Sequence, residues 1–162
     1  MKRKILSILV VAFLSTFSFA QEKSTLDWQV TSCQIKEEGI RMDMVSKDIQ
    51  ATAGLILYSN AQIDKIKNDF LSALQQEKNN KSTNFIGVTN VHKWEGYKYI
   101  SASDTAVLAH LTVIIPCDTK RVLLVDMAVP VGSLNAKVNW QKMTASWLKN
   151  YNTWAVMLSQ RR

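Results

Sequence analysis

The feature that most restricts the fold is a series of short, strand-like segments between positions 85 and 129, separated only by brief turns. The longest segment is 106–115, in which one face would be formed by Val107, Ala109, Leu111, Val113 and Ile115 and the other by Leu108, His110, Thr112 and Ile114. The intervening turns at Glu95-Gly96, Ser103-Asp104 and 116–120 are too short to hold the crossover that parallel neighbours require. We therefore expect a four-strand antiparallel meander over this half of the chain.

The first half of the chain adds three strands and one helix. Apolar alternation changes phase between Val30 and Cys33, which predicts one strand with a bulge, followed by a turn at 37–39 and a returning strand over 40–44. The apolar run 54–58 predicts a third, buried strand. Ser59 and Gln62 have the spacing of a capping box, and the helix that follows is amphipathic.

Two polar or irregular segments and a second helix complete the pattern. Residues 77–84 are rich in Asn and Lys and predict a polar loop, and 129–133 predicts another loop. A C-terminal helix is expected over 137–158, with an aromatic stripe that we interpret as core-facing. The fold class is thus α+β: a curved antiparallel sheet with helices packed on it.

Residues 1–20 have the three regions of a secretory signal peptide. Basic residues 2–4 precede an apolar stretch over 5–17, and small residues stand ahead of a cut after Ala20. Residues 21–162 then form one domain, which we expect to be periplasmic or secreted. No second apolar stretch of membrane-spanning length follows, so no transmembrane segment is expected after leader removal.

Charge and cysteine content narrow the classes of function. Without the leader, seventeen basic residues stand against thirteen acidic ones, and the basic residues are scattered rather than clustered in a stripe. A nucleic-acid partner is therefore not expected. The two cysteines, Cys33 and Cys117, predict one structural disulfide in an oxidising compartment, with two free thiols as the alternative.

The sequence contains few patterns that indicate chemistry. The two histidines, His92 and His110, belong to no metal-binding motif, and no nucleophile elbow or phosphate-binding glycine motif is present. No catalytic residue, metal site or cofactor is expected on these grounds, and the chain is predicted not to be an enzyme.

One pair of polar residues is an exception to this pattern. A three-residue loop at 117–119 would place His110 opposite Asp126, whereas a two-residue loop would separate them. Opposed, they would supply two members of a catalytic triad, with Ser101 or Thr112 as the nucleophile. Stabilisation of the sheet by a cross-strand polar pair is the simpler interpretation.

Three aromatic residues around one predicted hairpin have two interpretations. Trp94, Tyr97 and Tyr99 either pack within the sheet or form a recognition patch, because aromatic side chains are enriched both in strands and at binding hot spots.

The order of elements resembles the PsbP-like family, which includes small exported bacterial proteins of the DcrB type. The resemblance covers about 27–151 and rests on the Leu57-Tyr58 strand end before Ser59, the Gly96-Tyr97 turn, and the aromatic helix around 147–151. It implies an α/β/α sandwich and roles in binding and assembly that are mostly non-catalytic. The sequence lacks the lipobox of the lipoprotein members and extends past the usual end of such domains.

Three functions follow as expectations. The first is an exported, non-enzymatic domain that binds another protein of the cell envelope or a small apolar ligand through its surface. The second is a periplasmic immunity protein that neutralises a toxin from a competing cell, since inhibition needs only surface complementarity. The third is a small hydrolase that uses His110 and Asp126.

Overall fold

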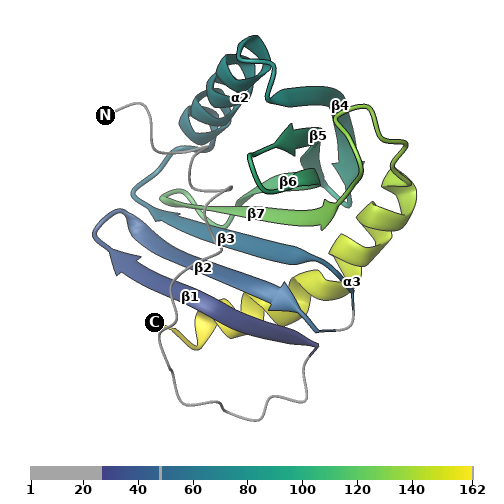
Figure 1. Ribbon diagram of the computed structural model, residues 1–162. Helices are drawn as coiled ribbons and strands as arrows, with labels where there is room; N and C mark the ends of the chain where they lie inside the picture. The colour runs from purple at the N-terminus through teal and green to yellow at the C-terminus, as the bar shows by residue number, and fades with distance from the viewer. Residues whose placement is uncertain (1–26, 48, 162) are drawn as a thin grey trace.

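The computed structural model describes residues 27–47 and 49–161, and this part of the chain consists of one antiparallel sheet and two helices (Figure 1). Its strands are β1 Trp28–Lys36, β2 Gly39–Ser46, β3 Thr52–Ser59, β4 Thr83–Val91, β5 Trp94–Ala102, β6 Val107–Pro116 and β7 Arg121–Pro130, and its helices are α2 Ile63–Asn79 and α3 Trp140–Ser159. The predicted α+β class is confirmed. The predicted leader, residues 1–20, lies outside the described residues.

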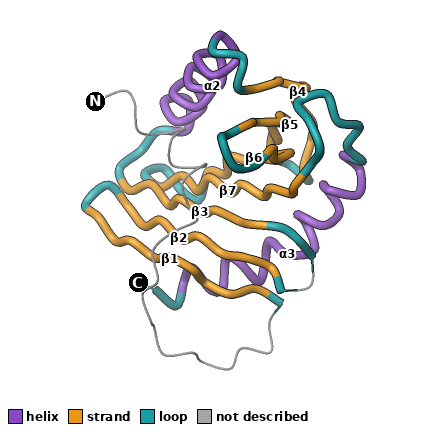
Figure 2. The backbone as a smooth tube through the Cα atoms, in the orientation of Figure 1, coloured by secondary structure: helices purple, strands orange, loops and turns teal. Residues whose placement is uncertain are grey.

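The strands lie in the order β1-β2-β3-β7-β6-β5-β4, and every neighbouring pair is antiparallel (Figure 2). Consecutive strands are neighbours except at β3, after which α2 carries the chain to β4 at the far edge. The predicted four-strand meander then returns the chain to the centre, where β7 pairs with β3. The predicted bulge in the first strand is confirmed between Val30 and Ser32.

The two helices pack against opposite faces of the sheet because side chains alternate along each strand. On one face, Ile66, Phe70 and Leu74 of α2 pack against side chains of β5, β6 and β7. On the other face, α3 packs against alternate residues of all the strands from β1 to β3 and of β6 and β7. The central strands β6 and β7 are thus covered on both sides, which explains why they are apolar over most of their length.

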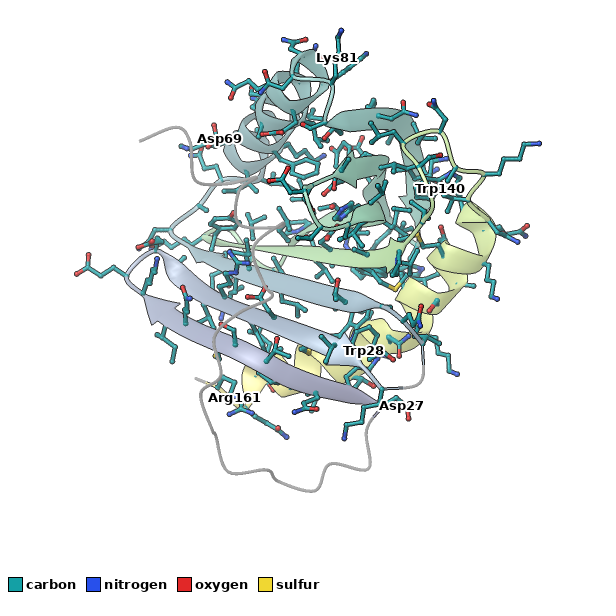
Figure 3. All side chains as sticks on the ribbon, in the orientation of Figure 1. Asp27, Trp28, Asp69, Lys81, Trp140 and Arg161 are labelled. Carbon is teal, nitrogen blue, oxygen red and sulfur yellow. The ribbon has the colours of Figure 1, made fainter. Side chains whose placement is uncertain are left out.

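The aromatic stripe of α3 lies in the core, as the sequence predicts. Trp147 and Trp154 are fully buried, and Trp28 of β1 packs edge-to-face on Trp154 at 5.0 Å between ring centroids. The indole Nε1 of Trp28 also donates to Asn150 Oδ1 at 2.9 Å, which ties β1 to the middle of α3. Figure 3 labels Trp28 and Trp140, which come from these two elements.

Several predicted boundaries are wrong by a few residues. Ser59 is the last residue of β3, and α2 begins after Gln62, whose side chain makes no capping hydrogen bond. The helix then continues to Asn79, and β4 begins at Thr83, so most of the predicted 77–84 loop is regular structure. Gln, Glu and Lys are good helix formers, which explains why a polar segment continues the helix.

The turn between β4 and β5 also differs from the prediction. It lies at His92-Lys93 rather than Glu95-Gly96, and His92 adopts a positive φ of 57°. A tight hairpin needs a residue in the left-handed region, and His is among the non-glycine residues enriched there. Gly96 is instead inside β5.

Gly39 has a conformation that only glycine adopts readily. Its φ is +145°, and a Cβ at this position would overlap the carbonyl oxygen of Leu57 on β3. It pairs with Tyr58 in the ladder, so the glycine allows β2 to start directly against its neighbour.

The predicted disulfide between Cys33 and Cys117 is not formed in this structure, where both cysteine side chains are exposed. Cys33 lies on the edge strand β1, and Cys117 follows β6, four strands away in the sheet. Neighbouring strands are about 4.8 Å apart, and a disulfide requires Cα atoms within about 7 Å. The register of the sheet therefore separates the two thiols.

Neither described helix has the length and apolar character needed to cross a membrane.

Candidate functional site: a buried polar network on three strands

Three adjacent strands place a serine, a histidine and an aspartate in hydrogen-bond contact on the α2 face of the sheet. Ser101 Oγ of β5 lies 2.8 Å from His110 Nε2 of β6, and His110 Nδ1 lies 2.9 Å from Asp126 Oδ2 of β7. The side chains are buried, with Ser101 8% exposed, His110 1% and Asp126 3%. This is the order of contacts found in a Ser-His-Asp triad.

A second branch of the network satisfies the other carboxylate oxygen. Thr112 Oγ1 donates to Asp126 Oδ1 at 2.6 Å, and the Tyr99 hydroxyl lies 3.3 Å from Thr112 Oγ1. Tyr99 also stacks on the His110 ring, with centroids 4.6 Å apart and an interplanar angle of 1°. The five side chains therefore form one connected network in which the carboxylate accepts from both sides.

The strand register corrects the predicted alignment of these residues. Thr112 is opposite Asp126, and His110 is opposite Ala128, because the loop is Asp118–Lys120 and not 117–119. Asp118 Oδ1 accepts from the backbone N–H groups of Lys120 and Arg121, each at 2.8 Å, which fixes this loop. His110 nevertheless reaches Asp126, because a two-residue shift keeps the same face and leaves the pair diagonal.

Tyr99 in the network and the nearby Tyr97 both keep their hydroxyl protons to high pH. Burial, and then the charge of Asp126, raise the pKa of Tyr99 well above its usual value. Burial also raises the pKa of Tyr97 to about 12, with a further contribution from its hydrogen bond to Glu95. Glu95 in turn accepts from Lys67 Nζ at 2.8 Å. Both hydroxyls therefore remain donors at physiological pH.

An acyl-transfer site needs two further features: free donors for an oxyanion and access for a substrate. The backbone N–H of Ala102, directly after Ser101, donates to Ser82 O at 2.8 Å, and the next N–H, of Ser103, donates to Ala106 O at 2.8 Å. In this conformation both donors nearest to Ser101 are engaged. Ser101, His110 and Asp126 thus have the hydrogen-bond connectivity of a triad. The backbone groups around them, however, are hydrogen-bonded to each other, as in the interior of a sheet.

The predicted aromatic patch is not assembled as a surface. Tyr97 and Tyr99 are buried on the α2 face, where each ring contacts Phe70. Trp94 is partly buried on the other face, where it contacts Trp147 and Tyr151 of α3. Strand alternation separates Trp94 from the tyrosines, so these three residues form parts of two cores and not one recognition patch.

One open depression on the surface offers little chemistry. An open depression of about 440 Å³ is lined by Ser59, Asn60 and residues 118–121. Its carboxylate, Asp118, is paired with Arg121 Nε at 2.6 Å and lies in the loop contacts given above. Among the described residues, no group of three or more His, Cys, Asp or Glu side chains could hold a metal ion.

Sequence reasoning identified His110, Asp126, Thr112 and Ser101 but did not connect Tyr99 to them. The available signal was parity, because all five residues fall on the same face of three neighbouring strands. Comparison with known proteins adds no further information about this site. The chain matches no protein-family model, and no curated protein matches it.

Proposed function

We propose that the protein is an exported, non-enzymatic binding domain that recognises an extended segment of another envelope protein along β4. The observation that carries this proposal is the character of that strand. β4 is an edge strand whose sequence, TNFIGVTNV, contains neither a charged residue nor a proline. Proteins commonly place such residues on edges to prevent pairing with other chains.

Two of the three exposed residues of β4 are apolar, and the third is Asn90. Val88 is 54% exposed and Ile86 is 42% exposed, although both belong to a regular strand. The register shift between Phe85 and Gly87 makes Ile86 the extra residue of a bulge, which divides the edge into two short pairing segments. A partner strand would pair its backbone with either segment, and its side chains would contact Ile86 or Val88.

Helix α2, which packs against β4, has an exposed apolar residue of its own. α2 packs against β4, and its Lys67 is held beside β5 by the ion pair with Glu95. Leu71 is one turn further along that flank of the helix and is exposed. Exposed apolar residues grouped in this way are typical of interaction surfaces.

The arrangement of elements supports the proposal that this is a PsbP-like α/β/α sandwich. Three strands, one helix, a four-strand meander and a C-terminal helix follow one another in that order, and the helices pack on opposite faces. An experimental structure compared with members of that family would test the assignment.

A double substitution at the edge tests the binding proposal. Val88→Lys with Ile86→Lys should abolish capture of the partner from envelope extract, because two charges would have to be buried against the added strand. Ile35→Lys with Ile49→Lys is the matched control, because it changes two exposed isoleucines away from β4, on β1 and in the β2–β3 connection, and it should capture the partner normally. Circular dichroism of both variants would establish that each is folded. Equal capture by the two variants would contradict recognition along β4.

Fractionation tests the proposed export. Material from the periplasm or medium should have the intact mass of a chain that begins at Gln21. A full-length chain retained in the cytosol would contradict it.

A second candidate function, a small hydrolase, is favoured by the Ser101–His110–Asp126 connectivity. Ser101 Oγ would attack an ester carbonyl as His110 Nε2 takes its proton, the alcohol would leave with that proton, and water would release the acid. A fluorophosphonate probe distinguishes the candidates. Labelling of the wild type but not of Ser101→Ala would favour the hydrolase, whereas absence of labelling would favour the binding domain.

A further inference from the structure

Charge is distributed unevenly along the chain. No aspartate or glutamate occurs after Asp126, whereas that segment contains five basic residues: Lys137, Lys142, Lys149, Arg161 and Arg162. Residues 21–126 contain all thirteen acidic residues and twelve basic ones. The positive charge of the chain without its leader therefore comes from the segment that contains α3.

Helix α3 presents an outer face that contains two lysines and two large aliphatic side chains, with Gln141, Ala145, Asn152 and Ser159 also exposed. Its aromatic side chains and Met143 are turned toward the sheet. Lys142, Leu148, Lys149 and Val156 are exposed, with Val156 54% exposed. Positions 142, 149 and 156 are separated by seven residues, so they lie close together along one side of the helix.

The surroundings of α3 add positive charge. Lys98 of β5 lies over the Trp140 ring at 6.0 Å, and Lys93 lies over Trp94 at 5.8 Å, both on the α3 side of the sheet. The strands beneath the helix contribute apolar side chains to its core. Figure 1 shows α3 crossing behind the sheet, and Figure 3 labels Trp140 and Arg161 at its two ends. The helix is thus the outer layer of this side of the protein.

We infer that the outer face of α3 docks on a bilayer surface that contains anionic phospholipid. Lysines are attracted by the negative surface potential, while Leu148 and Val156 can enter the boundary between headgroups and acyl chains. A lipid surface is favoured because exposed lysines and exposed aliphatic side chains share one helix face, which is the composition of helices that lie at the headgroup boundary. The tryptophans of α3 are turned inward, and its two lysines, Lys142 in the first turn and Lys149 in the middle, are exposed.

Sedimentation with vesicles tests this inference. The wild type should bind vesicles of phosphatidylcholine with phosphatidylglycerol, bind phosphatidylcholine alone much more weakly, and be released by high salt. Each lysine near a charged surface contributes about fivefold to affinity, so Lys142→Gln with Lys149→Gln should weaken binding about thirtyfold.

The matched control removes the same charge from the other layer. Lys78→Gln with Lys81→Gln changes two exposed lysines at the end of α2 and should leave binding within about twofold of the wild type, since these residues lie on the opposite face. All variants carry the same N-terminus, so a contribution from the leader cancels. Equal binding to both vesicle types, equal weakening by the two pairs of substitutions, or no binding by the wild type would overturn the inference.

Discussion

Removal of the Asp126 carboxylate tests how much the buried network stabilises the protein. Asp126→Ala would leave the Thr112 hydroxyl and the His110 Nδ1–H without their acceptor, in a place where neither side chain is exposed. Asp126→Asn offers a contrast, because its carbonyl can still accept from Thr112. Its amide can donate to His110 if the imidazole moves its proton to Nε2 and donates to Ser101.

The two substitutions should differ by a measurable amount. An unsatisfied buried group costs about 1–3 kcal/mol, so two such groups in Asp126→Ala should lower the free energy of unfolding by about 3 kcal/mol. Asp126→Asn exchanges charged hydrogen bonds for neutral ones and should cost about 1 kcal/mol. Since a domain is stable by about 5–15 kcal/mol, the alanine variant should lose a large part of its stability.

Urea unfolding measures this difference directly. With a slope of about 1.5 kcal/mol/M, the alanine variant should unfold about 2 M earlier than the wild type and the asparagine variant less than 1 M earlier. An alanine variant within about 1 kcal/mol of the wild type would refute the idea that the network is a stabilising unit. So would an asparagine variant that is less stable than the alanine one.

Three other outcomes are expected. Gly39→Ala should destabilise the protein by more than about 2 kcal/mol, because both the φ of Gly39 and its close neighbour exclude a Cβ. Gly132→Ala is the control and should change the urea midpoint little, because a Cβ there would meet open space. Equal midpoints for the two variants would contradict the requirement for glycine at position 39. Stability should fall as pH rises from about 10 to 12, because the pKa of Tyr97 is lower in the unfolded chain than in the folded protein. A Tyr97→Phe variant should show a shallower fall in its thermal midpoint over that range. A maleimide reagent should label Cys33 in the native protein, because its side chain is exposed. Protection of Cys33 would show that this residue is bonded or covered in solution.

The strand pattern was the most predictable part of the fold, because period-two alternation fixes which side chains share a face. The alternation predicted that His110 and Thr112 share one face of their strand, and that a bulge precedes Cys33. It did not fix the register, which depends on whether a turn begins at Cys117 or at Asp118. That choice is made by the hydrogen bonds that Asp118 accepts from Lys120 and Arg121, and not by any hydrophobic pattern.

The wrong prediction at the cysteines and the open choice at the tyrosines have one cause. Sequence indicates which side of a strand a residue occupies, but not which strands are neighbours. The order in which β7 lies between β3 and β6 separates Cys33 from Cys117. Tyr97 and Tyr99 are buried because α2, which connects β3 to β4, packs over them.

The pairing of β3 with β7 also has a consequence for how the chain folds. β1 to β3 and β4 to β7 are each built from contacts between consecutive strands, which form over short loops. The two groups of strands meet where β3 pairs with β7, for example at Ser59 and Arg121, and α2 and three strands lie between these residues in the sequence. Because long-range pairing slows folding, we expect two separately nucleated meanders to dock in the rate-limiting step. Substitutions along β3 and β7 should therefore slow folding more than those in the outer hairpins.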